Sequence, residues 1–143
     1  MKVKVMRLRK DIPLPQYRHQ GDAGVDLLNA GENISLKPQE RALIPTGIKV
    51  AIPSGYELQI RPRSGLAINK GLTILNTPGT VDSTYRGEVM VIIFNTSPKE
   101  TIEIKRGERI AQAVLKKVEH IEWEECERLD ETTRNEGGFG STG

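Results

Sequence analysis

The chain has 143 residues, a length that predicts a single domain with its own hydrophobic core. Its net charge of +2 excludes bulk nucleic-acid binding, which requires a strongly basic face. No apolar stretch approaches the length needed to span a bilayer, so we expect no membrane contact.

The N-terminus and the cysteine content indicate the compartment. The first residues, Met1–Arg7, are too charged to resemble a signal peptide. Cys126 is the only cysteine, which excludes an internal disulfide, and we expect it to be a small buried or half-buried hydrophobic residue. These features predict a soluble protein of the cytoplasm or another intracellular compartment.

Most of the chain alternates between apolar and polar residues, which is the period of a half-buried β-strand. The alternating segments are Lys2–Leu8, Ile34–Leu36, Ile48–Ile52, Tyr56–Ile60, Thr101–Ile104 and Ile110–Leu115. A fuller apolar run at Glu88–Phe94 predicts a strand that is buried on both faces. Aromatic residues are only 4% of the chain, so we expect a core of Ile, Val and Leu.

Turn residues separate these segments. The turn signals are Pro38, Pro45, Pro53–Gly55, Pro62, Pro78–Gly79, Ser97–Pro98 and Arg106–Gly107. Only Ser64–Lys70 predicts a helix, of one or two turns, and Glu124–Glu131 is ambiguous. Short strands between turns predict an all-β fold, a jelly-roll-like barrel or sandwich with one short helix. We expect one domain over residues 1–130 and a flexible, glycine-rich C-terminal arm over residues 131–143.

Polar residues at the start of the expected helix offer the first candidate site. Arg63, Ser64 and Gly65 lie where a strand ends and the helix begins, and a helix N-terminus beside an arginine favours anions. The alternative is a serine N-cap flanked by solvated arginines.

Two aspartates interrupt the β pattern. Asp82 lies within Gly79–Gly87, a segment that reads as a hairpin, together with Tyr85. Asp82 suits a general base that orients water, and Tyr85 could stack on a sugar, although both residues are also common in turns. Asp26 interrupts an apolar segment, where it would pair with an arginine or face a metal-bound water.

The last ten residues, Arg134–Gly143, combine glycines with one aromatic ring, one arginine and a Ser-Thr pair. Glycines allow backbone N–H groups to approach an anion, Phe139 offers a flat face for a base, and Arg134 offers a fork for a phosphate. This pattern predicts a lid that orders over a nucleotide. The alternative is an ordinary disordered terminus.

Five segments in this order resemble the five motifs of the trimeric dUTPase family. They are Ala23–Leu27, Arg61–Ala67, Gly79–Gly87, Gly107–Gln112 and Arg134–Gly143. The resemblance covers the chain from about residue 20 to its end. It implies a homotrimer with active sites shared between subunits, and the Mg²⁺-dependent hydrolysis of dUTP to dUMP and pyrophosphate. That reaction limits uracil incorporation into DNA and supplies dUMP for thymidylate synthesis.

The resemblance also implies roles for individual residues. Asp82 would orient the attacking water, and Asp26 would contact the metal only through water. Tyr85 and Met90 would line the sugar pocket, and Asn76, Gly79, Thr80 and Val81 would read uracil. The phosphate-binding residues would be Arg63, Ser64, Gly65 and Gln112, and the lid residues would be Arg134, Phe139, Gly140, Ser141 and Thr142.

Two other functions remain open at this stage. A dCTP deaminase shares the fold, but its chemistry needs a glutamate in the base pocket, where this sequence offers Asp82 and Tyr85. A trimeric β scaffold or regulatory module without activity would not need Asp82 or the glycine-rich tail.

Overall fold

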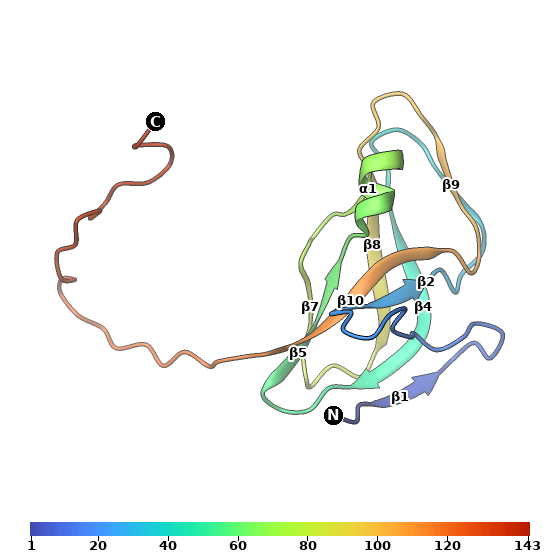
Figure 1. Ribbon diagram of the computed structural model, residues 1–143, viewed down its shortest axis with the longest axis horizontal. Helices are drawn as coiled ribbons and strands as arrows, with labels where there is room; N and C mark the ends of the chain where they lie inside the picture. Colours follow the sequence, from blue (N-terminus) through green and yellow to red (C-terminus); the bar gives the residue numbers. More distant parts are fainter.

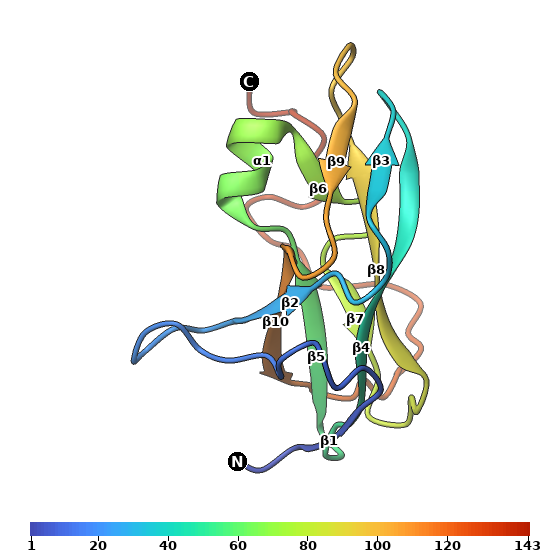
Figure 2. The same cartoon turned by 90° about the vertical axis from the view of Figure 1, so that its right-hand side faces the viewer.

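The computed structural model describes residues 1–143 and is built mainly of strands (Figures 1 and 2). One four-stranded sheet has the order β1 (Lys4–Arg7), β4 (Arg41–Ala51), β8 (Glu88–Asn95) and β6 (Leu72–Ile74). The other has the order β2 (Val25–Leu28), β10 (Arg109–Lys117), β5 (Tyr56–Arg61) and β7 (Gly79–Val81). A two-stranded sheet joins β3 (Ile34–Leu36) to β9 (Ile102–Ile104), and α1 (Ser64–Lys70) is the only helix.

The hydrophobic core lies between the two larger sheets. It is made of aliphatic side chains, as the scarcity of aromatic residues predicts, with Leu27 and Ile60 from one sheet meeting Val91 and Ile93 from the other. The expectation of an all-β sandwich with one short helix is therefore confirmed. The sheets are not closed into a barrel.

Strand β4 is longer than the sequence predicts because it continues through Pro45. Its first half pairs with β8 as far as Pro45, and its second half, from Ile48, pairs with β1. The register with β8 shifts between Pro45 and Lys49. Proline has no N–H to donate to a ladder, so it is tolerated at this irregularity. The expected turn at Pro45 is wrong.

The expected hairpin at Gly79–Gly87 is also wrong. Residues Gly79–Val81 form β7, which pairs with β5 in one sheet, whereas β8 pairs with β4 and β6 in the other. The chain therefore crosses from one layer to the other before β7 and crosses back after it. Turn residues alone do not distinguish a hairpin from such a crossing.

Strand β8 is buried on one face only. Val89, Val91 and Ile93 are buried, whereas Met90 on the opposite face is 37% exposed. Leu43, on the adjacent strand β4, is 58% exposed. The expectation that β8 is buried on both faces is wrong for a single chain, and an apolar strip remains uncovered along β4 and β8.

The helix has the predicted bounds, Ser64–Lys70, but a different cap. Arg63 is the N-cap residue and makes no side-chain capping bond, so Ser64 is the first helical residue and not the cap. Gly71 ends the helix in the left-handed region, at φ 65°, and its N–H donates to the Ala67 carbonyl. Glycine adopts this conformation at little steric cost.

Beyond β10 the chain forms an arm that leads away from the sheets (Figure 1). Residues 124–131 form no helix, and Cys126 is exposed, so the expectation of a buried or half-buried cysteine is wrong. The division into residues 1–130 and 131–143 stays a prediction. No helix in the structure is long and apolar enough to cross a membrane.

An ion pair fastens the segment after β1 to the turn between β9 and β10. Arg106 donates to the Asp11 carboxylate through Nη2, at 2.7 Å, and through Nε, at 3.1 Å. The same guanidinium donates to the carbonyls of Ala30 and Gly31. The hydrogen bond from Arg106 lowers the pKa of Asp11.

We expect the Asp11→Asn variant to be less stable than the wild type at neutral pH. Because the folded-state pKa is lowered, this stabilisation is complete above the ordinary carboxyl pKa and is lost as the pH falls through the lowered pKa. Urea unfolding across the acid range, at fixed protein concentration, measures the difference. Asp130→Asn, in the arm, is the control, and a wild-type advantage that is independent of pH would contradict the prediction.

Candidate functional site

A polar hollow of about 520 Å³ lies where the loop between β1 and β2 meets the start of α1 and the strands β2 and β10. It brings together five residues that the sequence singled out. These are Asp26, Arg63, Ser64, Gly65 and Gln112. Its remaining lining comes from Arg18, His19, Asp22, Ala23, Gly24 and Arg109.

Asp26 lies among three arginines at the centre of this hollow. Its Oδ1 accepts a hydrogen bond from Arg63 Nε at 2.9 Å, and its Oδ2 accepts one from Arg109 Nη1 at 3.4 Å. Arg18 Nε is 3.7 Å from the same Oδ2. The Asp26 side chain is only 18% exposed. Of the two interpretations of Asp26, the structure therefore shows arginine pairing.

The strand order brings these groups together. Strand β10 lies between β2 and β5, so that Gln112 is opposite both Asp26 and Arg61. Gln112 Nε2 donates to the Pro62 carbonyl at 2.9 Å, just before the helix begins. A Cβ at position 24 would be 2.9 Å from Gln112 Oε1, so only glycine fits there without displacing that amide.

The start of α1 contributes backbone donors. Ser64 and Gly65 line the hollow and are exposed, and N–H groups in the first helical turn have no partner inside the helix. With Arg63 beside them, these groups suit an anionic ligand.

A second hollow, of about 280 Å³, collects the residues around the crossing from β7 to β8. It includes the predicted residues Thr80, Val81, Asp82, Tyr85 and Met90. Its other lining residues are Leu43, Glu88 and Val89. The two hollows share no lining residue.

Tyr85 is held in place within this second hollow. Its Oη donates to the Glu88 carbonyl at 2.9 Å, and its ring lies over Gly87, where an added Cβ would overlap the phenol. Asp82 is exposed, and its backbone carbonyl accepts from the Tyr85 N–H at 3.1 Å. The Asp82 carboxylate is thus left free at a fixed turn.

Asn76 and Gly79 lie next to each other at the entry to β7. Gly79 is buried, and a Cβ there would be 3.3 Å from Asn76 Nδ2. Asn76 itself is exposed and lines neither hollow.

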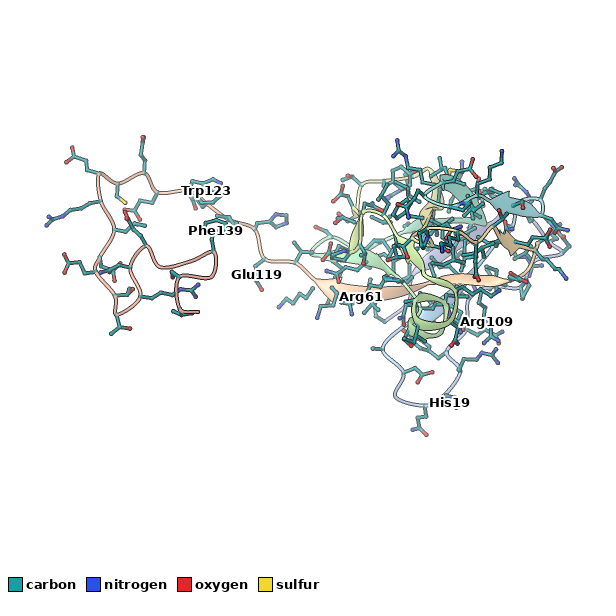
Figure 3. The ribbon with its side chains drawn as sticks, turned by 90° about the horizontal axis from the view of Figure 1, so that it is seen from above. His19, Arg61, Arg109, Glu119, Trp123 and Phe139 are labelled. Atoms are coloured by element: carbon teal, nitrogen blue, oxygen red, sulfur yellow. The ribbon has the colours of Figure 1, made fainter.

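The predicted lid residues lie in the arm, away from both hollows. Figure 3 places Phe139 far from Arg109 and Arg61, and the Phe139 ring is fully exposed. Arg134 Nε donates to the Gly137 carbonyl at 2.7 Å, which forms a local turn. Gly140, Ser141 and Thr142 are exposed. One chain therefore holds most of the predicted site residues in the two hollows and the arm, with Asn76 and Gly79 outside all three.

Sequence reasoning missed two of the arginines at Asp26. Arg109 belongs to Gly107–Gln112, one of the five segments that resemble the motifs of a known family. That resemblance was the signal from which Arg109 could have been found. Arg18 had no such signal, because only the fold brings the loop between β1 and β2 to the hollow.

The protein offers no ready-made cage for a metal ion, since no group of three His, Cys, Asp or Glu side chains comes together. Asp22 and Asp26 are the carboxylates that line the polar hollow, and arginines occupy both oxygens of Asp26. A metal ion here would depend on ligand oxygens and waters.

Comparisons with known proteins show the family of the chain. The dUTPase family profile matches residues 10–143. The chain is 57% identical to the deoxyuridine 5'-triphosphate nucleotidohydrolase of Fusobacterium nucleatum, covering 100% of this chain and 97% of the relative. It is 54% identical to the enzyme of the same name from Finegoldia magna, covering 100% and 99%.

Solved structures give the same result. A Staphylococcus bacteriophage 80alpha dUTPase with dUpNHpp superposes with a TM-score of 0.87 at 31% identity, covering 99% of this chain and 98% of that one. A dUTPase mutant from the S. aureus phage phi11, described with a structural Mg(II) ion, superposes with a TM-score of 0.81 at 27% identity, covering 90% and 99%.

We expect Asp26→Asn to destabilise the fold by about 1–3 kcal/mol, because partly buried arginines lose the charge that holds them together. Urea unfolding at fixed protein concentration measures the loss, and added sodium chloride should recover part of it by screening the arginines. The control is Asp22→Asn, which removes a carboxylate from the same hollow but only a bond to the His19 N–H. Equal effects of the two substitutions would refute the central role of Asp26.

Proposed function

This chain belongs to the dUTPase family, and from that premise we propose that it hydrolyses dUTP to dUMP and pyrophosphate. The observation that carries the proposal is the polar hollow, in which three arginines, Gln112 and the free N–H groups of α1 outnumber two carboxylates. Such a hollow has a net positive charge, which would attract a polyphosphate. The relatives' shared name specifies the substrate, and the cytoplasmic nucleotide pool is where we expect this chain to act.

In this proposal the polar hollow binds the phosphates. Arg63 and Gln112 donate from their side chains, and Ser64 and Gly65 donate from the first turn of α1. Charged donors and preorganised N–H groups are the strongest partners for phosphate oxygens. Asp26 holds Arg63 and Arg109 in position before the substrate arrives, so these two arginines need no rearrangement at binding.

The second hollow binds the nucleoside. Tyr85, fixed by the Glu88 carbonyl and by Gly87, would pack on the deoxyribose and exclude a 2′-hydroxyl, with Met90 beside it. Asn76, Gly79, Thr80 and Val81 would read uracil through backbone groups and the Asn76 amide. Asp82, whose carboxylate is free at a fixed turn, would orient the water that attacks the α-phosphorus and accept its proton.

The residues of the polar hollow fit a Mg²⁺ ion that they would contact only through water. Mg²⁺ commonly keeps several waters and binds through substrate phosphates and one or two carboxylates. Asp26, already paired with arginines, would contact such an ion through water. When bound, the ion neutralises phosphate charge and supports the in-line geometry of the displacement.

We further propose that the working unit is a homotrimer with shared sites. The phosphate hollow and the nucleoside hollow share no lining residue, and the lid lies away from both, which supports a site assembled from more than one copy. The uncovered apolar strip that includes Leu43 and Met90 is consistent with burial between copies.

The arm would complete the site as a lid. Phe139 would stack on the base, while Arg134 and the segment Gly140–Thr142 would cover the terminal phosphate. Closure would exclude bulk water from the reaction. The exposed, glycine-rich sequence of the arm suits a segment that becomes ordered only when the ligand is bound.

We expect the wild type to release pyrophosphate from dUTP in the presence of Mg²⁺ and far less from dCTP. Asp82→Asn should lower kcat by roughly 10²–10⁴-fold, the usual contribution of a positioned base, with little change in nucleotide affinity. Steady-state pyrophosphate release and titration with a non-hydrolysable dUTP analogue measure the two quantities. Ser83→Ala, one residue along, is the control, and a variant that binds poorly but turns over normally would exclude Asp82 as the base.

The shared-site proposal predicts recovery of activity when two inactive variants are mixed. Asp82→Asn and a chain lacking residues 134–143 should each be inactive, because each lacks one part of the site. Co-refolding them in equal amounts should restore about one quarter of the wild-type activity, the share of sites in which random assembly supplies both parts from different chains. Light scattering should give a mass near three chains, and no recovery in a mixed trimer would show that both parts come from the same chain.

A further inference from the structure

Arg18 is the one arginine of the polar hollow whose guanidinium donates no hydrogen bond. Arg63 and Arg109 each donate to Asp26, at 2.9 and 3.4 Å, whereas Arg18 Nε stays 3.7 Å from Oδ2. It is also the most exposed of the three, with 57% of its side chain accessible. Its donors are therefore available to another partner.

The charges in the hollow do not balance without such a partner. Three arginines face two carboxylates, and the Asp22 carboxylate already accepts the His19 N–H at 2.8 Å. Asp26 makes its two hydrogen bonds to Arg63 and Arg109. Arg18 is thus held by Asp26 at ion-pair distance only, at the rim of a hollow with excess positive charge.

Arg18 lies on a different element from the other two arginines of the hollow. It belongs to the loop between β1 and β2, which projects from the sheets and carries His19 at its outer end (Figures 2 and 3). Arg63 precedes α1, and Arg109 begins β10. An anion bound at the start of α1 would therefore share the hollow with Arg18, which comes from a different element.

We propose that Arg18 is a further substrate-contacting residue, which turns from Asp26 to donate to the terminal phosphate of the bound nucleoside triphosphate. The inference rests on the proposed function of the hollow. Arg18 then distinguishes substrate from product, because dUMP has no phosphate that reaches the rim. The guanidinium stays charged throughout and contributes binding, not proton transfer.

The test compares Arg18→Gln, Arg18→Lys and the control Arg41→Gln. Arg41 is an exposed arginine at the start of β4, outside both hollows, so its substitution changes the net charge equally. Arg18→Gln should raise KM for dUTP roughly 3- to 10-fold, the loss of one exposed charge-assisted contact. The inhibition constant of dUMP should not change.

A second measurement does not depend on turnover. Calorimetry with inorganic tripolyphosphate should show weaker binding to Arg18→Gln by a similar factor, with most of the affinity kept in Arg18→Lys and all of it in Arg41→Gln. The salt dependence of binding should also become shallower in Arg18→Gln, because one fewer cation meets the anion.

Two outcomes would overturn the inference. If Arg18→Gln weakened dUMP and dUTP equally, Arg18 would only hold the loop in place. If it bound tripolyphosphate and dUTP as the wild type does, the rim contact would not exist. Failure of the proposed function is distinct from both, since the wild type itself would then release no pyrophosphate from dUTP.

Discussion

The arrangement of side chains in the polar hollow depends on a single carboxylate, Asp26. It pairs with arginines from three separate parts of the chain. Arg18 comes from a loop, Arg63 from the start of the helix and Arg109 from the start of the last strand. Without the negative charge between them, the three guanidinium groups would repel one another across a shared hollow. With it, they stand ready around a site that still has a positive excess. The fold thus gathers three arginines around one carboxylate and leaves a net positive charge in the hollow.

The sheet order is what makes this arrangement possible. Because β10 lies between β2 and β5, residues far apart in sequence, Asp26 and Gln112, become direct neighbours across a ladder. Core residues of β2, β5 and β10, among them Leu27, Ile60 and Ala113, pack behind this sheet and hold it in position. The geometry of the hollow is therefore as well determined as the register of β10.

Patterns among neighbouring residues predicted much of the fold, but the sequence carried no pattern that showed which distant segments pair. Alternation located most strands and the helix Ser64–Lys70, because side-chain period depends on neighbouring residues alone. Alternation does not say which strands pair, so the crossing around β7 was mistaken for a hairpin, and Pro45 was mistaken for a turn although a register shift accommodates it. Many residues of the two hollows could be predicted from their chemistry and from the motifs that contain them. The contact of Arg18 with Asp26 was not, because it exists only once the loop and the sheet are folded together.

In the proposed assembly, the arm is a tether as well as a lid. Between the end of β10 at Lys117 and Arg134 lie 16 residues (118–133), which span roughly 50 Å when fully extended. A group on such a tether has an effective local concentration set by the length and stiffness of the connection, in the millimolar range for short flexible linkers, and not by the amount of protein in solution. In the proposed trimer, closure over a neighbouring site would therefore be independent of dilution for as long as the assembly holds. The composition of residues 118–133 would then set how often the proposed site is covered.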